Sequence, residues 1–195
     1  RIGLLGGSFN PPHQGHLRIS LYALKKLGLD RIWWIVTPGN PLKEHGNLAP
    51  LAERMEAARR LARHPRIVIT DFEAALPSRY TAATIAFLSR RFAHTRFVWL
   101  MGADNLAGFH RWRNWRAIAA TMPIAVVDRP GWRFKALASP AAHFLARCRW
   151  PESRSPRLPE ASPPAWVFLT ARLSPASSTA LRAANSAPRK VAQPT

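Results

Sequence analysis

The chain has 195 residues, of which 47% are hydrophobic and 20% are charged, enough for one globular domain with a buried core. This excludes a peptide hormone, a collagen-like repeat and a wholly disordered chain. Lys and Arg outnumber Asp and Glu by 29 to 10, and the formal charge of +19 favours anionic partners. From charge alone we do not expect the anion to be nucleic acid.

The cysteine content indicates the compartment. Cys148 is the only cysteine in the sequence and has no partner for an intramolecular disulfide, so nothing requires an oxidising environment and we expect the cytoplasm. No uninterrupted apolar run approaches the roughly 18 residues that span a bilayer. We therefore expect no membrane partner.

Short apolar runs alternate with longer segments of helical periodicity along the chain. Their shortness and their content of Val, Ile and aromatic residues predict buried strands. The six runs are residues 2–5, 32–36, 67–69, 97–101, 124–127 and 166–169. Strands that are apolar on both faces and alternate with helices predict the α/β class, with a single doubly wound, mostly parallel sheet and helices on both faces.

The connections set the domain boundaries. Five prolines among Ser, Arg and Glu in residues 150–164 predict an exposed connection before the last strand. Residues 186–195 hold two prolines and little to bury, which predicts a disordered tail. No segment is left to supply a second core, so residues 1–185 are predicted to form one domain.

The segment from Gly6 to His16 follows the first strand and leads into the first helix, where ligands bind in open α/β sheets. Gly6 and Gly7 let a ligand approach the main chain. His13 and His16 are three residues apart, so both imidazoles can face one anion at the helix start. The sequence predicts a phosphate site here. The alternatives are a metal site, for which no third ligand is apparent, and a turn whose histidines are incidental.

The same segment, Gly-Gly-Ser-Phe-Asn-Pro-Pro-His-Gln-Gly-His, resembles the H-x-G-H nucleotidyltransferase superfamily, and its first eight residues are similar to those of bacterial nicotinate-nucleotide adenylyltransferases. The resemblance covers about residues 1–185. Further segments that resemble this family lie at residues 38–43, 80–84, 102–112 and 177–182.

The resemblance implies a Rossmann-like fold and transfer of AMP from ATP to nicotinate mononucleotide. We expect Mg²⁺ with the ATP, because the charge of a polyphosphate needs a cation. The resemblance also implies that His13 and His16 contact the ATP phosphates, as charged groups or hydrogen-bond donors. Arg182 then completes the catalytic set from the other end of the chain. The residues expected to bind ATP are Gly6, Gly7, Ser8, Phe9, His13, His16, Ser177, Ser178, Thr179 and Arg182.

A second group of residues is implied to bind the mononucleotide. Trp112 would stack on the nicotinate ring, Thr84 would recognise its carboxylate, and Asp104 would bind ribose hydroxyls or orient a cation. The full group is Asn10, Lys43, Thr84, Gly102, Asp104 and Trp112. For three of these residues a structural role stays open as the alternative: Trp112 could pack in the core, Asp104 could cap a helix, and Lys43 could be a solvated side chain.

The sequence departs from the family pattern at Ala83, where many relatives carry an acidic residue. This puts in doubt a hydrogen bond near the mononucleotide. Two rival functions stay open. One is adenylyl transfer to nicotinamide mononucleotide or phosphopantetheine, and the other is a basic RNA-binding protein on the same fold, which would bind oligonucleotides in a strongly salt-dependent way.

Overall fold

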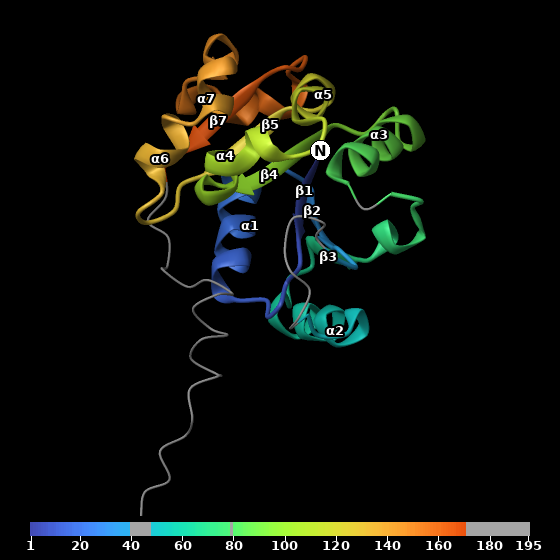
Figure 1. Cartoon of the computed structure of the whole chain (residues 1–195). Coiled ribbons are helices and arrows are strands. Elements are labelled where there is room, and N and C mark those ends of the chain that lie inside the picture. Colours follow the sequence, from blue (N-terminus) through green and yellow to red (C-terminus); the bar gives the residue numbers. More distant parts are fainter. Residues whose placement is uncertain (40–47, 79, 171–195) are drawn as a thin grey trace, which may run out of the picture.

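A computed structural model of the whole chain describes residues 1–39, 48–78 and 80–170 (Figure 1). Within these residues the chain forms seven strands. They are β1 (Ile2–Gly7), β2 (Arg31–Val36), β3 (Ile67–Thr70), β4 (Phe97–Gly102), β5 (Ile124–Val127), β6 (Arg149–Trp150) and β7 (Trp166–Leu169).

All seven strands belong to one parallel sheet in the order β3-β2-β1-β4-β5-β7-β6. The order reverses at β1, because the chain builds outward through β2 and β3 on one side and through β4 and β5 on the other. Parallel strands end at the same edge, and ligands bind in the crevice beyond the carboxyl ends where the order reverses. The loops after β1 and β4 therefore border the expected site.

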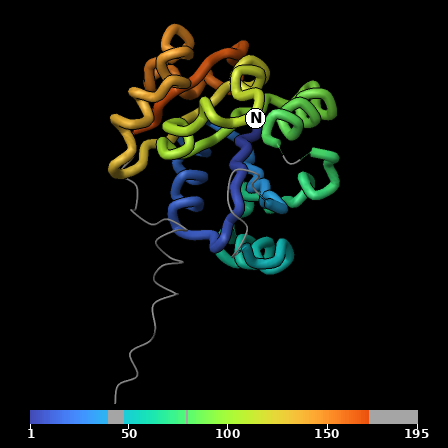
Figure 2. Tube along the Cα trace, viewed as in Figure 1, coloured from blue at the N-terminus to red at the C-terminus, as the bar shows by residue number. Residues whose placement is uncertain are grey.

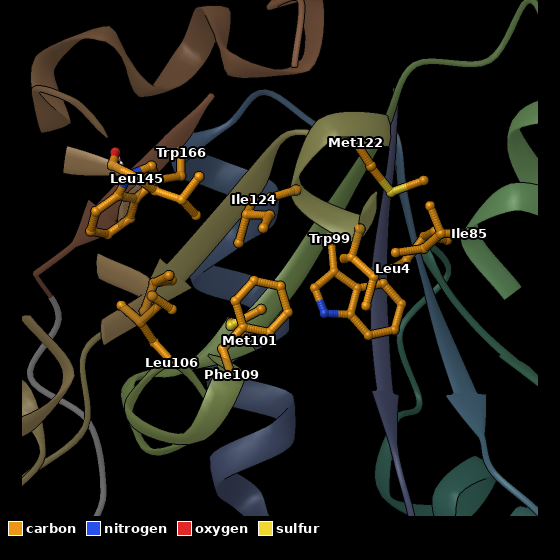
Figure 3. Packing of buried hydrophobic residues seen from close by; sticks show 14 of the residues in the cluster. Leu4, Ile85, Trp99, Met101, Leu106, Phe109, Met122, Ile124, Leu145 and Trp166 are labelled. Atoms are coloured by element: carbon orange, nitrogen blue, oxygen red, sulfur yellow. Dashed lines mark hydrogen bonds between the residues drawn. The ribbon is translucent and has the colours of Figure 1, made fainter. Parts of the chain in front are cut away.

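Successive side chains on each strand point to opposite faces of the sheet, and this divides the core in two. Leu4, Trp99 and Met101 belong to one buried cluster (Figure 3), whereas Leu5 and Leu100 belong to the other. Each cluster contains residues from strands and from helices. The sheet is thus covered on both faces, as its apolar strands predict.

Helices cover both faces (Figure 2). The second cluster takes buried side chains from α1 (Gln14–Lys26), α2 (Leu51–Leu61) and the 3-10 helix η4 (Glu152–Glu160). The first cluster takes them from α3 (Thr81–Arg91), α4 (Ala103–Gly108), α5 (Trp115–Thr121), α6 (Arg133–Leu137) and α7 (Pro140–Phe144). Shorter 3-10 turns are η1 (Phe72–Ala75), η2 (Phe109–Arg111) and η3 (Ala146–Cys148).

The structure confirms the predicted fold class and all six predicted strands, and it adds one. The added strand, β6, has only two residues and lies at the edge of the sheet. The connection predicted over 150–164 is largely exposed, but it is not irregular, because η4 occupies most of it and buries Ser155, Leu158 and Pro159. The tail predicted over 186–195 lies outside the described residues. In the part of the chain that the structure describes, no helix is long and apolar enough to cross a membrane.

Candidate functional site

Two histidines cap the first turn of α1. His13 precedes the helix with an extended backbone, and its Nδ1 atom accepts a hydrogen bond from the Gly15 N–H at 3.1 Å. The Nδ1 atom of His16 accepts one from the His13 N–H, also at 3.1 Å. The pair forms a capping box in which imidazoles take the places usually held by a hydroxyl and a carboxylate. The helix start and the orientation of both rings are therefore fixed together.

These bonds decide where each imidazole carries its proton. Because Nδ1 is the acceptor in both rings, the neutral rings hold their hydrogen on Nε2. The ring centroids are 3.8 Å apart. Over the described ranges, neither Nε2–H donates to another protein group. The helix start thus presents two adjacent N–H donors, as the phosphate-site prediction requires.

Both imidazoles are held neutral at physiological pH. Burial is the largest cause in each case: it lowers the pKa of His13 to about 4, helped by the charge of Arg129 and opposed by Asp104. Burial, with His13 and Arg129 adding to it, lowers the pKa of His16 to about 3. Of the two roles left open, charge or hydrogen-bond donation, the unliganded site therefore favours donation.

Aromatic rings pack against the His16 ring, and a hydroxyl group bonds to its main chain. The Phe9 ring lies 4.7 Å from the His16 ring and stacks on Trp34 at 4.9 Å with an interplanar angle of 16°. The Trp34 indole N–H donates to the Ser20 hydroxyl at 2.7 Å, and this hydroxyl donates to the His16 carbonyl at 2.9 Å. Phe9 itself is buried with a left-handed φ of 47°. The surroundings must hold such a backbone in place, since it costs free energy in a non-glycine residue.

The glycines before the histidines bring the main chain close to the core. A Cβ atom on Gly6 would lie 2.7 Å from the outer ring of Trp99 on β4, closer than real Cβ contacts allow. Gly7 is the last residue of β1, and its carbonyl accepts a hydrogen bond from the Thr37 N–H at 3.0 Å. The loop therefore leaves the sheet along a path that a larger residue at position 6 would block.

An arginine that the sequence reasoning missed reaches the same place. Arg129 lies just beyond β5, and its Nη1 atom donates to Asp104 Oδ2 at 2.5 Å. Its charge lowers the pKa of both His13 and His16, which places the guanidinium in their electrostatic neighbourhood. The Arg-Pro-Gly sequence that begins at residue 129 is typical of a turn. Nothing in that pattern indicated a cation at the site.

Asp104 follows β4 as predicted, but it is not a helix cap. The residue before α4 is Gly102, and no side chain caps the helix. The Asp104 carboxylate instead folds back over Gly102, into the space that a Cβ atom there would occupy. This explains the glycine at 102 and excludes the cap alternative. Binding of ribose or a cation by Asp104 stays a prediction, since its carboxylate is paired with Arg129.

The Thr84 hydroxyl takes part in a buried hydrogen bond. The residue is completely buried, and its hydroxyl donates to Glu73 Oε1 at 2.5 Å. Glu73 is itself buried, and burial raises the pKa of its carboxyl despite the opposing bonds with Thr84 and Thr37. The Thr84 hydroxyl is therefore already used within the protein, and its predicted contact with the substrate carboxylate stays a prediction. Sequence reasoning also missed Glu73.

Trp112 is half-buried beside the first core cluster. Its ring meets the rings of Phe109 and Trp99 edge-on, with centroids 5.4 Å and 6.5 Å away. The core alternative therefore holds in part, and stacking on a ligand ring stays a prediction. Nearby, the Arg113 guanidinium lies 4.6 Å from the centre of the Tyr80 ring, in cation–π geometry.

The remaining predicted residues divide between those that are described and those that are not. Asn10 lies in the loop, and its side-chain oxygen accepts a hydrogen bond from the Ala49 N–H at 3.4 Å. Outside the described residues lie Lys43, Ser177, Ser178, Thr179 and Arg182. Within residues 1–39, 48–78 and 80–170 no cluster of three or more His, Cys, Asp or Glu forms a metal site. The histidine pair therefore has no third ligand there.

The chain is similar in sequence to a family of known proteins. The profile of the cytidylyltransferase-like family matches residues 4–184. A protein of Bradyrhizobium sp. (strain BTAi1) named "Probable nicotinate-nucleotide adenylyltransferase" is 60% identical over 182 residues, which cover 93% of this chain and 95% of the relative. A protein of the same name from Methylorubrum extorquens is 56% identical, with coverage of 93% and 98%.

A solved structure has a similar fold. The nicotinic acid mononucleotide adenylyltransferase of Plasmodium falciparum, complexed with NaAD, matches with a TM-score of 0.69, covering 93% of this chain and 82% of that chain. The sequence identity is 14%. A match at this identity supports the fold alone.

Proposed function

Because the chain belongs to the nicotinate-nucleotide adenylyltransferases of the cytidylyltransferase-like family, we propose that it transfers AMP from ATP to the phosphate of nicotinate mononucleotide. The products are deamido-NAD and pyrophosphate. In this reaction a phosphate oxygen of the mononucleotide bonds to the α-phosphorus of ATP, and the bond from that phosphorus to the oxygen bridging to the β-phosphate breaks. We expect the protein to work in the cytoplasm.

The observation that carries the proposal is the pair of Nε2–H donors at the start of α1. Transfer between phosphates needs little covalent help from the protein, but it needs the reactants in line and the growing charge stabilised. His13 and His16 are oriented by their own Nδ1 bonds before any ligand arrives. Donors fixed in advance do not have to reorganise as charge develops on the α-phosphate.

Among the described residues, we propose Arg129 as the main source of positive charge at the site. Its guanidinium is paired with Asp104 and lies close enough to lower the pKa of both imidazoles. A polyphosphate would offer it a stronger acceptor than one carboxylate, because guanidinium groups bind phosphate through two parallel bonds. We propose that Arg129 contacts the phosphates of ATP or of the mononucleotide.

The rest of the ATP site is proposed from the family resemblance. Main-chain groups of Gly6, Gly7, Ser8 and Phe9 would border the phosphates. The hydroxyls of Ser177, Ser178 and Thr179 and the guanidinium of Arg182 would hold the triphosphate from the carboxy-terminal side. Arg182 is the planar cation among them, which suits it to bind two phosphate oxygens at once.

The mononucleotide site is proposed beside the carboxyl end of β4. Asn10 and Lys43 would hold its phosphate side, and Gly102, Asp104, Thr84 and Trp112 would surround its ribose and pyridine ring. Because Thr84 is completely buried and its hydroxyl already donates to Glu73, its side chain would contact the ligand only if that bond were given up. Trp112 would supply an aromatic surface next to the ring.

We propose that Mg²⁺ enters with ATP. The described residues fit this arrangement better than a resident metal, because no acidic cluster is found among them and Asp104 is already paired with Arg129. A polyphosphate provides the oxygen ligands that Mg²⁺ prefers. When bound, the ion would neutralise charge on the leaving pyrophosphate, while the protein's own donors hold the α-phosphate.

The first experiment is pyrophosphate release from ATP in the presence of Mg²⁺ and one acceptor at a time. We expect turnover with nicotinate mononucleotide to exceed that with nicotinamide mononucleotide and phosphopantetheine. A clear preference for phosphopantetheine would overturn the substrate assignment. Tight, salt-dependent binding of an oligonucleotide with no pyrophosphate release would favour the RNA-binding alternative.

A further inference from the structure

One buried arginine is not among the predicted site residues. Arg54 lies in the first turns of α2 and is 3% exposed. Its Nε donates to the Ala49 carbonyl at 2.8 Å, and its Nη1 donates to the Ser8 carbonyl at 2.7 Å and the Thr37 carbonyl at 2.8 Å. A longer bond of 3.4 Å runs from Nη2 to the Pro38 carbonyl. No carboxylate pairs with it in the described parts of the chain.

These four carbonyls come from three separate segments. Ser8 follows β1, residues 37–38 follow β2, and Ala49 precedes α2. Burial of a charged group without a counter-ion costs free energy that hydrogen bonds only partly return, and burial lowers the pKa of Arg54 accordingly. An apolar side chain would fill the same space without that cost. The guanidinium therefore does more than fill space: its hydrogen bonds fix the orientation of the carbonyl groups that accept them.

The bond to Ser8 fixes a peptide unit in the histidine loop. A trans peptide is planar, so its N–H points opposite to its C=O. Since the Ser8 carbonyl points at Arg54, the Phe9 N–H points away from Arg54 and α2. Among the described residues nothing accepts a hydrogen bond from this N–H. The Phe9 ring lies 4.7 Å from the His16 ring, so the free donor belongs to the same loop as the two imidazoles.

We infer that Arg54 is a positioning residue that turns the Phe9 N–H into a third fixed donor for the bound phosphate, beside the Nε2–H groups of His13 and His16. This inference rests on the proposed function. Phe9 has a left-handed backbone, which needs outside support. Its stacked ring supports it on one side and the Arg54 bond to Ser8 on the other. Loss of the guanidinium would free the peptide to rotate.

The alternative is that Arg54 only ties α2 to the sheet. In that case its loss would lower stability and leave ligand affinity of the folded protein unchanged. The two interpretations can be distinguished by measuring ligand affinity under conditions in which every variant is fully folded. Arg54→Met removes the donors and keeps most of the volume, and Arg54→Lys keeps the charge but not the planar fork.

The test is calorimetric titration with α,β-methylene-ATP and Mg²⁺ well below the melting temperature of each variant. We expect Arg54→Met to weaken binding about tenfold and to lower kcat more than it raises the KM for the mononucleotide, with Arg54→Lys in between. Arg59→Met, an exposed arginine on the same helix, should match the wild type. Leu158→Ala removes a buried side chain of η4 and should lower stability. Its folded form should bind α,β-methylene-ATP as tightly as the wild type, which controls for a loss of stability alone.

A second measurement does not depend on any variant. In the wild-type protein, the backbone ¹⁵N–¹H signal of Phe9 should shift when α,β-methylene-ATP is added. An unshifted Phe9 signal, or Arg54→Met binding within twofold of the wild type, would overturn the inference. If the wild type binds the analogue but makes no pyrophosphate with nicotinate mononucleotide, the proposed function fails while the binding comparison still decides the role of Arg54.

Discussion

The His13 main-chain N–H donates to the Nδ1 atom of His16 at 3.1 Å, so the residue that caps α1 also orients the neighbouring imidazole. One hydrogen bond thus serves the helix and the site. It satisfies an N–H that the helix leaves without an intrahelical acceptor, and it commits the His16 proton to Nε2. A substitution at position 16 can therefore be chosen to keep the first effect and remove the second.

His16→Asn should separate these effects. The asparagine oxygen lies near the place of Nδ1 and can accept from the His13 N–H, but no group replaces the Nε2–H. We expect kcat for pyrophosphate release to fall by at least about tenfold, a loss of about 1.4 kcal/mol of transition-state stabilisation, with the melting temperature nearly unchanged. Gln14→Ala, in the same turn, is the control. Wild-type rates in both His13→Asn and His16→Asn would refute the assigned roles.

The pH dependence of stability should follow from the lowered pKa values of His13 and His16, about 4 and about 3. Unfolding returns each to its ordinary value of 6.5, so between about pH 6.5 and pH 3 the unfolded chain binds more protons than the folded one. The contribution of the two histidines to the free energy of unfolding should therefore be complete above pH 6.5 and be lost as the pH falls. Urea denaturation at pH 7.5 and pH 5 would measure this, with the double variant His13→Asn/His16→Asn losing less.

The activity profile gives an independent check on the same groups. Because both imidazoles are neutral in the free protein, neither should contribute an inflection to kcat/KM near pH 6.5. An inflection there that disappears in His16→Asn would mean that His16 titrates normally and acts as a charged group.

Arg129→Met should raise the pKa of both histidines, since the Arg129 charge lowers them. Asp104→Asn should lower the pKa of His13 further, because the carboxylate raises it. NMR titration of the imidazole Cε1–H signals would measure both. We also expect Arg129→Met to lower kcat/KM by at least about tenfold, as loss of a charge-assisted bond to phosphate would do. Unchanged histidine pKa values would place Arg129 outside the site.

Arg182→Ala should mainly raise the KM for ATP and leave kcat with saturating ATP less affected. The reason is the proposed grip of the guanidinium on the triphosphate, a contact made in the ground state as well as in the transition state. Steady-state kinetics with varied ATP would measure it. Arg189→Ala, in the predicted tail, is the matched control. If both variants behave like the wild type, the carboxy-terminal motif does not take part in ATP binding.

The strands could be predicted because each buried run is short, apolar and bounded by turn residues. β6 could not, because Arg149–Trp150 is two residues long and gains its place only by pairing with β7. Likewise, the sequence around Arg54, which also contains Glu53 and Glu56, has the composition of a solvated helix face. Its burial depends on carbonyls that the fold brings from residues 8 and 37.

The histidine pair, unlike Arg54, could be predicted, because a spacing of three residues at a helix start is a local property of the sequence. Arg129, Glu73 and Asp104 depend on contacts between segments far apart in the chain: Arg129 bonds to a residue 25 positions away and Glu73 to one 11 positions away. No pattern within one segment reports such a contact. The sequence therefore predicted Asp104 without its partner.

Gly6→Ala should destabilise the protein by about 1–3 kcal/mol, because the new methyl group would press on the outer ring of Trp99. Gly6 and Trp99 lie on the paired strands β1 and β4, so the ring can yield only by disturbing the first core cluster. Trp99→Phe removes the ring atoms nearest to Gly6. In that background the cost of Gly6→Ala should shrink, and urea denaturation of the four proteins in this double-mutant cycle would give the coupling. Equal costs in both backgrounds would show that the close approach of Gly6 to the indole does not explain the glycine.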